Sequence, residues 1–139
     1  MTALSTAPTT SSDSLLRLAM RADAVLSGLG GIALMVAAGP VSGFTGIPTA
    51  VEYGAGAGFV VYGIVVFVAA GLQRVRTAGI ATMVANLVFT VAAVLIVLAG
   101  SATLTTAGVV LVLAGGLYTL VFADLQYLGV RRMKAHGRD

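Results

Sequence analysis

The stretch AGIATMVANLVFTVAAVLIVLAG, residues 78–100, contains no charged side chain and ends on a glycine. At 1.5 Å per residue, an α-helix of this length crosses the roughly 30 Å of hydrocarbon in a bilayer. The stretch therefore predicts a membrane-spanning helix. We therefore expect the rest of the chain to be adapted to a lipid bilayer as well.

The whole chain has the composition of a membrane protein. Of its 139 residues, 58% are hydrophobic and 9% charged, against about 25% charged residues in soluble domains, and the mean hydropathy is +1.03. We predict an all-α fold, a four-transmembrane-helix bundle running up-down-up-down over residues 14–130. The predicted spans cover residues 22–39, 53–72, 78–100 and 104–127. A disordered polar tail, 1–13, precedes the bundle, and a basic tail, 131–139, follows it.

The basic residues predict the orientation. They flank the first span, fill the link between spans two and three, and follow the last span: Arg17, Arg21, Arg74, Arg76, Arg131, Arg132, Lys134 and Arg138. The other two connections, 39–52 and 100–106, contain none. Cytoplasmic loops carry an excess of Lys and Arg. We therefore expect both termini to be cytoplasmic, in the cytoplasmic (inner) membrane of a bacterium.

Several classes of chemistry lack the residues that they need. The chain has no cysteine and one histidine, His136, which lies in the basic tail. Disulfides, thiol redox chemistry, and zinc or haem ligation are excluded on this ground. The pI of about 9.8 comes from arginines at membrane boundaries, so it does not indicate nucleic acid. We predict no catalytic, cofactor-binding or metal-binding residue, and no enzymatic activity.

Helix signals mark the longest connection. Gly39 and Pro40 are expected to stop the first span. The sequence TAVE, Thr49 to Glu52, has the spacing of a capping box, which gives the Glu52 carboxylate a structural role at the start of span two. The loop between these signals is expected to rest on the lipid headgroups. Alternatively, it dips back towards the bilayer.

Small and polar side chains predict the bundle interior. In lipid, helices associate by close approach and by hydrogen bonds between polar groups. Helical periodicity places such residues on one face of spans three and four: Thr82, Asn86, Thr90, Gly115 and Thr119. Asn86 is the most deeply placed, with Ser27, Tyr118 or Thr119 as expected partners. The same row suits either helix packing or a conduction path.

Span two carries two faces of small residues. One contains Gly54 and Gly58, and the other contains Gly56 and Gly63, about 140° away. Two faces predict two partners. One is a helix of the same bundle, and the other is a second protomer or a larger membrane complex. The abundance of glycine, 18 residues in the chain, also produces such patterns by chance.

Two aspartates stand near predicted membrane boundaries. In VFADLQYLGVRR, residues 121–132, Asp124 follows the last apolar run, and Asp23 lies at the expected inner end of span one. Because the first and last spans of such a bundle are neighbours, we predict an ion cluster at the inner interface. It comprises Asp23, Asp124, Arg17, Arg21 and Arg131. The alternative is that one aspartate carries a proton or cation.

The segments 15–34, 83–100 and 121–132 together resemble a family of small, largely uncharacterised integral membrane proteins of high-GC Gram-positive bacteria. The resemblance covers residues 14–132, with basic helix starts, an Asn in span three, and a Leu-Gln pair before terminal arginines. It implies four helices and no particular activity. The chain departs from compact multidrug exporters, whose first span holds an embedded glutamate.

We expect a small non-enzymatic membrane protein that acts by association, as a homo-oligomer or as an accessory subunit of a membrane complex. The second hypothesis is a small transporter or channel with an Asn/Thr-lined path and an aspartate on the cytoplasmic side. The third and last-ranked hypothesis is an enzyme acting on lipid or quinone. It ranks last because no nucleophile, base or metal constellation is present. The expected partners are the lipid bilayer and other membrane proteins, and no cofactor is expected.

Overall fold

The structure is a computed structural model that describes residues 11–100 and 103–136, with side chains from 13 to 134 in those ranges. All of its regular elements are helices: α1 (Ser11–Val36), α2 (Ala38–Thr45), α3 (Thr49–Ala69), α4 (Val75–Gly100) and α5 (Thr106–His136). By length and composition, 4 of these helices, all except α2, are able to cross a membrane. The predicted all-α architecture with four spanning helices is confirmed.

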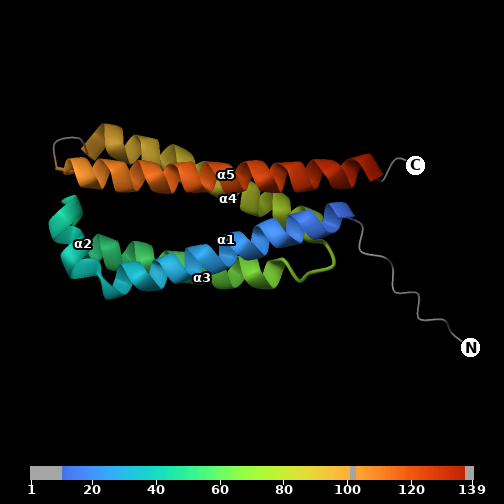
Figure 1. Cartoon of the computed structure of the whole chain (residues 1–139), viewed down its shortest axis with the longest axis horizontal. Coiled ribbons are helices and arrows are strands. Elements are labelled where there is room, and N and C mark those ends of the chain that lie inside the picture. Colours follow the sequence, from blue (N-terminus) through green and yellow to red (C-terminus); the bar gives the residue numbers. More distant parts are fainter. Residues whose placement is uncertain (1–10, 101–102, 137–139) are drawn as a thin grey trace, which may run out of the picture.

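The long helices form two antiparallel pairs. Helix α1 packs along α3, and α4 packs along α5 (Figure 1). The pairs meet mainly through α1 and α5, whereas α3 and α4 contact each other little. They lie close together near the chain ends and further apart towards α2. The two pairs are therefore in closer contact near the chain ends than towards α2.

Glycines let α1 and α3 approach closely. A Cβ atom added to Gly31 would lie 2.5 Å from the Gly56 carbonyl oxygen, and one at Gly56 would lie 2.7 Å from the Gly31 carbonyl oxygen. One at Gly63 would lie 2.6 Å from the carbonyl oxygen of Ala24. Such approach is how helices associate in lipid, where no hydrophobic force joins them. The face of span two with Gly56 and Gly63 is therefore occupied by the chain's own α1.

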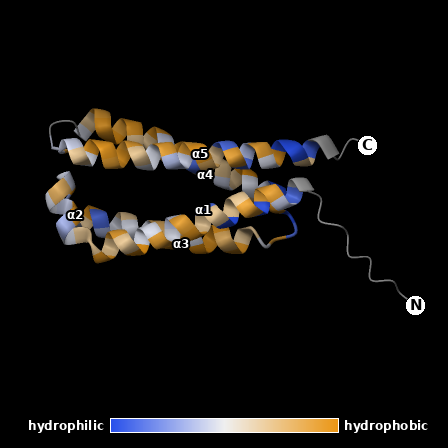
Figure 2. Cartoon of the chain, viewed as in Figure 1, coloured by the Kyte–Doolittle hydropathy of each residue, from blue (hydrophilic) through white to orange (hydrophobic). Residues whose placement is uncertain are grey.

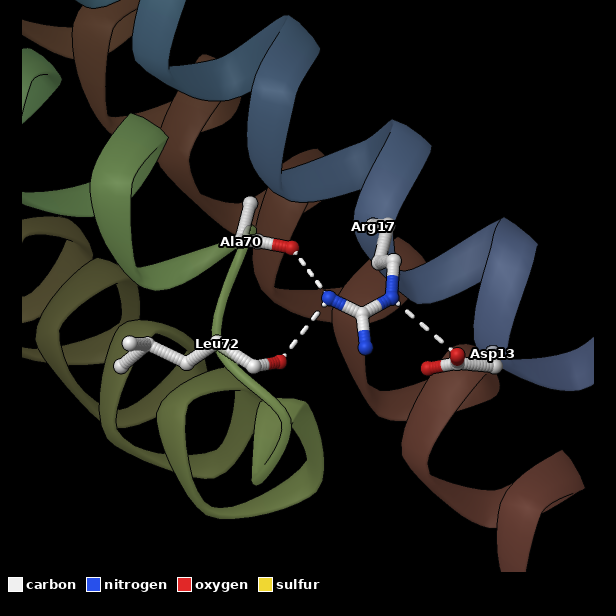
Figure 3. A network of polar contacts seen from close by, with 4 residues as sticks. All are labelled: Asp13, Arg17, Ala70 and Leu72. Atoms are coloured by element: carbon white, nitrogen blue, oxygen red, sulfur yellow. Dashed lines mark hydrogen bonds and ion pairs between the residues drawn. The ribbon is translucent and has the colours of Figure 1, made fainter. Parts of the chain in front are cut away.

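Arg17 fastens the end of the bundle where the two pairs are in closer contact. Its Nη1 donates to the carbonyl oxygens of Ala70 and Leu72, at 2.6 and 2.9 Å, and its Nε donates to Asp13 at 3.1 Å (Figure 3). The last carbonyls of a helix have no partner within it. Arg17 supplies donors to the end of α3 and so ties α1 to the turn between α3 and α4.

The connection between the first two spans is mostly helical, which corrects the expectation that Gly39 and Pro40 end a helix. Helix α1 ends at Val36, and α2 begins at Ala38. Pro40 lies in the first turn of α2, where a missing N–H costs no hydrogen bond. Gly46, with φ of 78°, ends that helix in the left-handed region that favours glycine.

Helix α2 is attached to the start of α5. The Thr105 N–H donates to the Thr45 carbonyl at 3.0 Å, and the Thr105 hydroxyl donates to the Phe44 carbonyl at 2.7 Å. A Cβ atom on Gly108 would collide with the Thr45 carbonyl oxygen. Residues 39–45 are thus held against the bundle by backbone contacts.

The helix ends differ from the predicted ones in two further places. Helix α1 begins at Ser11, so part of the predicted tail 1–13 is helical, and α5 continues to His136 through most of the predicted basic tail. Residues 1–10 and 137–139 lie outside the described residues. At the start of α3, no side chain caps the helix, so the predicted Thr49–Glu52 capping box is not formed.

Surface hydropathy agrees with a bilayer environment. Hydrophobic side chains cover most of the length of the helices, and hydrophilic ones gather near the chain ends (Figure 2). Large apolar residues such as Leu98, at 70% exposure, point away from the bundle. The described fold is therefore that of a small membrane protein, with lipid as the expected neighbour of these faces.

Candidate functional site: a buried aspartate beneath an apolar cavity

A carboxylate, Asp23 of α1, accepts hydrogen bonds from side chains on all the long helices. Its side chain is 0% exposed. The donors are Ser27 on α1, Tyr62 on α3, Asn86 on α4, and Tyr118 and Gln126 on α5. We call Asp23 and these donors the Asp23 network.

The donors divide between the two carboxylate oxygens. Oδ1 accepts from the hydroxyls of Ser27 and Tyr118, each at 3.1 Å. Oδ2 accepts from the Tyr62 hydroxyl at 2.8 Å, and from the amides of Asn86 and Gln126 at 2.8 and 3.0 Å. An ionised carboxylate only accepts hydrogen bonds, at about four lone-pair positions. The arrangement therefore suits the charged form of the side chain.

The two amides also bond to each other. The Asn86 Nδ2 that donates to Asp23 also donates to Gln126 Oε1 at 3.1 Å. Asn86 thereby spends its two N–H groups on two different helices, and Gln126 uses its oxygen as well as its nitrogen. In a low-dielectric interior, a fully satisfied network of this kind rigidifies the packing, and loss of one member leaves the others unpaired.

Hydrogen bonds from several helices are needed to hold a carboxylate at this place. An aspartate at the centre of a membrane helix costs roughly 3 kcal/mol on insertion scales. Interhelical hydrogen bonds in bilayers contribute roughly 0.6 kcal/mol each on average. One or two such hydrogen bonds would not offset the cost of burying the carboxylate. The hydrogen bonds that Asp23 accepts together contribute a free energy of about the same size as that cost.

Asp23 lies deeper than the sequence predicts. The candidate span of α1 runs from Asp13 to Val36, which places Asp23 near its middle. At 1.5 Å per residue, Asp23 lies about 9 Å further along the helix than Arg17. Its partner Asn86 is likewise near the middle of α4. The carboxylate is therefore at mid-depth of the bundle and not at its inner end.

The structure does not bring the predicted ion cluster together. Asp124, Arg21 and Arg131 are exposed on the outside of the bundle, and Arg17 is bonded to Asp13 and backbone carbonyls. Among the described residues, the hydrogen-bond donors of Asp23 are all uncharged. The reason is geometric, because residues two positions apart on a helix point about 160° away from each other. Gln126 faces inwards, so Asp124 faces outwards.

The predicted row of spans three and four lies in the interior except at Gly115, which is exposed, and its polar side chains bond to different partners. Thr82 donates to the Ala78 carbonyl of its own helix at 2.8 Å. Thr90 and Thr119 share a hydrogen bond at 2.8 Å that joins α4 to α5. Asn86 bonds to Asp23 and Gln126 in place of the partners expected for it. The Thr90–Thr119 and Asn86–Gln126 bonds join α4 to α5, and Asn86 alone of this row belongs to the Asp23 network.

Above the network, a cavity of about 600 Å³ opens between the two helix pairs. Its polar end is formed by Ser27, Tyr62, Asn86 and Tyr118, and apolar residues of every long helix form the walls. Towards α2 it reaches Glu52. A largely apolar pocket with a few polar groups at one end is the usual form of a small-molecule site.

Glu52 has a different neighbour from the predicted one. It is 3% exposed, and its Oε1 lies 3.0 Å from the Thr45 hydroxyl of α2. The same hydroxyl lies 2.9 Å from the Val41 carbonyl. Glu52 therefore connects α3 to α2 and places a second buried carboxyl group in the cavity wall.

The predicted packing glycines serve three different environments. Gly56 and Gly63 are buried against α1. Gly54 and Gly58 are exposed, and a Cβ atom on either would meet nothing within 4 Å. Gly115, which the sequence assigns to the interior, is exposed; it borders the cavity, and an added Cβ atom would meet nothing within 4 Å.

Sequence reasoning missed Tyr62 as a functional residue and misplaced Asp23. A usable signal was present, because Asp23 and Ser27 are four residues apart and so share a face of α1 with the small residues Ala24 and Gly31. The two arginines before Asp23 suggested a membrane boundary. In the structure Arg21 points outwards, where a long side chain can extend towards the interface.

No family model, curated protein or solved structure matches this chain. The Asp23 network and the cavity above it are therefore the features from which we infer a function.

Replacing Asp23 by asparagine should destabilise the bundle, whereas the same change at exposed Asp124 should not. An asparagine presents an NH₂ group to donors that need an acceptor, and losing a bond to a charged group costs roughly 1.5–3 kcal/mol. Thermal unfolding in detergent, followed by circular dichroism, measures the difference. Equal midpoints for Asp23→Asn and Asp124→Asn would contradict the role given to the network.

Proposed function

We propose that this chain is a small non-enzymatic transport protein of the bacterial cytoplasmic membrane. It binds a membrane-soluble molecule in the cavity and passes it across the bilayer by movement of the α1–α3 pair against the α4–α5 pair. The observation that carries the proposal is the position of Asp23. The carboxylate lies at mid-depth, bonded to every long helix, at the polar end of a cavity of about 600 Å³.

Ionisable side chains inside membrane spans are rare and usually functional. Carriers place their binding site near the bilayer midplane, where two halves of the protein rock around it and expose it to each side in turn. Here each pair packs tightly within itself, and the two pairs meet through fewer contacts. That division supports rocking at the level of the Asp23 network.

The basic residues support an orientation for this cycle. Arg17, Arg74, Arg76 and Arg131 all lie at the end of the bundle away from α2. With these residues cytoplasmic, both termini lie inside the cell, and the cavity occupies the outer half of the membrane. We also propose that the chain is related to the small four-span membrane proteins of high-GC Gram-positive bacteria that its sequence resembles.

The proposal includes no chemical step. The described residues contain no group of three or more His, Cys, Asp or Glu side chains placed to hold a metal ion. The Asp23 carboxylate is surrounded by donors and has no free lone-pair position for a substrate group. Binding and movement, with the lipid bilayer as the main partner and no nucleic acid, account for these features more simply than catalysis.

Single cysteines test alternating access without knowledge of the substrate, because the chain contains none. Ser27→Cys, at the polar end of the cavity, should react with a membrane-impermeant thiol reagent in both right-side-out and inside-out vesicles. Thr103→Cys should react only from outside, and Thr77→Cys only from inside, because these exposed residues lie at opposite ends of the bundle. Reaction is measured by mass spectrometry.

The lipid-facing variant Leu95→Cys is the matched control and should react from neither side. Reaction of Ser27→Cys from one side only would reduce the cavity to a static pocket. Reaction from neither side would leave the network a purely structural device. Reversed labelling of Thr103→Cys and Thr77→Cys would overturn the orientation.

Association is a second candidate function, and the exposed face of α3 favours it. Gly54 and Gly58 form a small-residue face that none of the described helices covers. In lipid such faces allow close helix contact. A second copy or another membrane subunit packed here would make the chain a homo-oligomer or an accessory subunit, and this role is compatible with transport.

Leucine substitutions separate the two glycine faces. Gly54→Leu with Gly58→Leu should lower the native mass in mild detergent to that of one chain while preserving the unfolding midpoint. Gly56→Leu with Gly63→Leu should destabilise the chain itself, by about 1–3 kcal/mol per site, since both positions are packed against α1. An unchanged native mass in the first variant would count against association through this face.

A further inference from the structure

We propose that the cavity selects organic cations with a large apolar body, such as lipophilic phosphonium or quaternary ammonium ions. The inference rests on the proposed transport function and names its substrate class. It follows from the charges, the hydroxyl groups and the aromatic rings that surround the cavity.

The charges around the cavity have one sign. Asp23 lies directly behind its polar end, and Glu52 stands in its wall. Among the described residues, no Lys, Arg or His lines the cavity. Arg21 is on the opposite, exposed face of α1, and Arg17 is bonded to carbonyl oxygens at the end of α3. Charges interact far more strongly in an apolar interior than in water, so the cavity favours a positive ion.

The hydroxyl groups between Asp23 and the cavity also favour a positively charged ligand. The hydroxyls of Ser27 and Tyr62 donate to Asp23 at 3.1 and 2.8 Å, and the Tyr118 hydroxyl lies 3.1 Å from both Asp23 Oδ1 and the Asp23 carbonyl oxygen and 3.2 Å from the Ser27 hydroxyl. Each hydroxyl oxygen then keeps lone pairs, and all three side chains line the cavity. A cation in the cavity would meet oxygens that are polarised by the buried carboxylate. It needs no direct contact with Asp23, which is completely buried.

Aromatic rings complete the site. Phe89 of α4 lies with its ring centroid 6.0 Å from those of Phe59 and Tyr62 of α3, at 51° and 81°. These three rings and that of Tyr118 all line the cavity. Ring faces attract cations, and quaternary ammonium ions in particular, when water is excluded. The apolar walls suit the body of such an ion and the rings suit its charge.

Two probes of nearly the same size and shape and of opposite charge test the inference. Tetraphenylphosphonium and tetraphenylborate are titrated by equilibrium dialysis against the wild-type protein in detergent. Binding to the cavity is defined by its loss in Gly115→Phe, because this glycine borders the cavity and an added Cβ atom there meets nothing within 4 Å, so that a phenyl ring can occupy part of the site without a backbone clash. We expect the phosphonium to bind on the order of tenfold more tightly than the borate, or better.

Carboxyl variants locate the source of the preference. Asp23→Asn should weaken phosphonium binding by about tenfold, Glu52→Gln should weaken it less, and Asp124→Asn, outside the bundle, should leave it unchanged. If Asp23→Asn fails to fold, the comparison of the two probes on the wild type remains decisive. Equal binding, tighter borate binding, or no cavity binding of either ion would overturn the inference.

The outcome is separable from that of the proposed function. Two-sided reaction of Ser27→Cys with no preference for the phosphonium would leave transport standing and remove the cation class. Reaction of Ser27→Cys from one side only, together with a clear preference for the phosphonium, would remove the transport function and leave a cation-binding membrane protein.

Discussion

The Asp23 carboxylate needs donors that no single helix can supply, and the rest of the bundle follows from that need. Two of its partners, Tyr62 and Asn86, come from α3 and α4, which otherwise contact each other mainly through the rings of Phe59, Tyr62 and Phe89. A bilayer offers no water at this depth to replace them. The helices therefore meet at Asp23, and the space above it remains open because each helix pair is held together by its own contacts.

The α1–α3 pair owes its geometry to residues that bring no side chain. Gly31, Gly56 and Gly63 let two backbones approach within contact distance, and Arg17 closes the end of the interface through backbone carbonyls. These contacts set the depth and rotation of α1. The Asp23 side chain therefore faces the α4–α5 pair. Rotation of α1 about its axis in either direction would expose the carboxylate to lipid.

The sequence predicts the number and approximate position of the long helices, because hydropathy and span length report directly on the bilayer. It also assigns Asn86 and Thr119 to the interior correctly by periodicity. It cannot predict helix α2, which depends on contacts with Thr105 far along the chain. It cannot decide which glycine face of α3 meets α1. It does not predict the depth of Asp23, because the nearby Arg17 and Arg21 are typical of residues at a membrane boundary.

A double-mutant cycle between Asp23→Asn and Tyr62→Phe, measured as unfolding free energies in detergent, tests whether the Asp23 carboxylate joins the helices. We expect a coupling of about 1 kcal/mol, since each change removes the same hydrogen bond. The matched cycle with Tyr53→Phe, an exposed tyrosine of the same helix, should be additive to within about 0.3–0.5 kcal/mol. Additive effects for Tyr62 as well would contradict the claim that this carboxylate joins the helices.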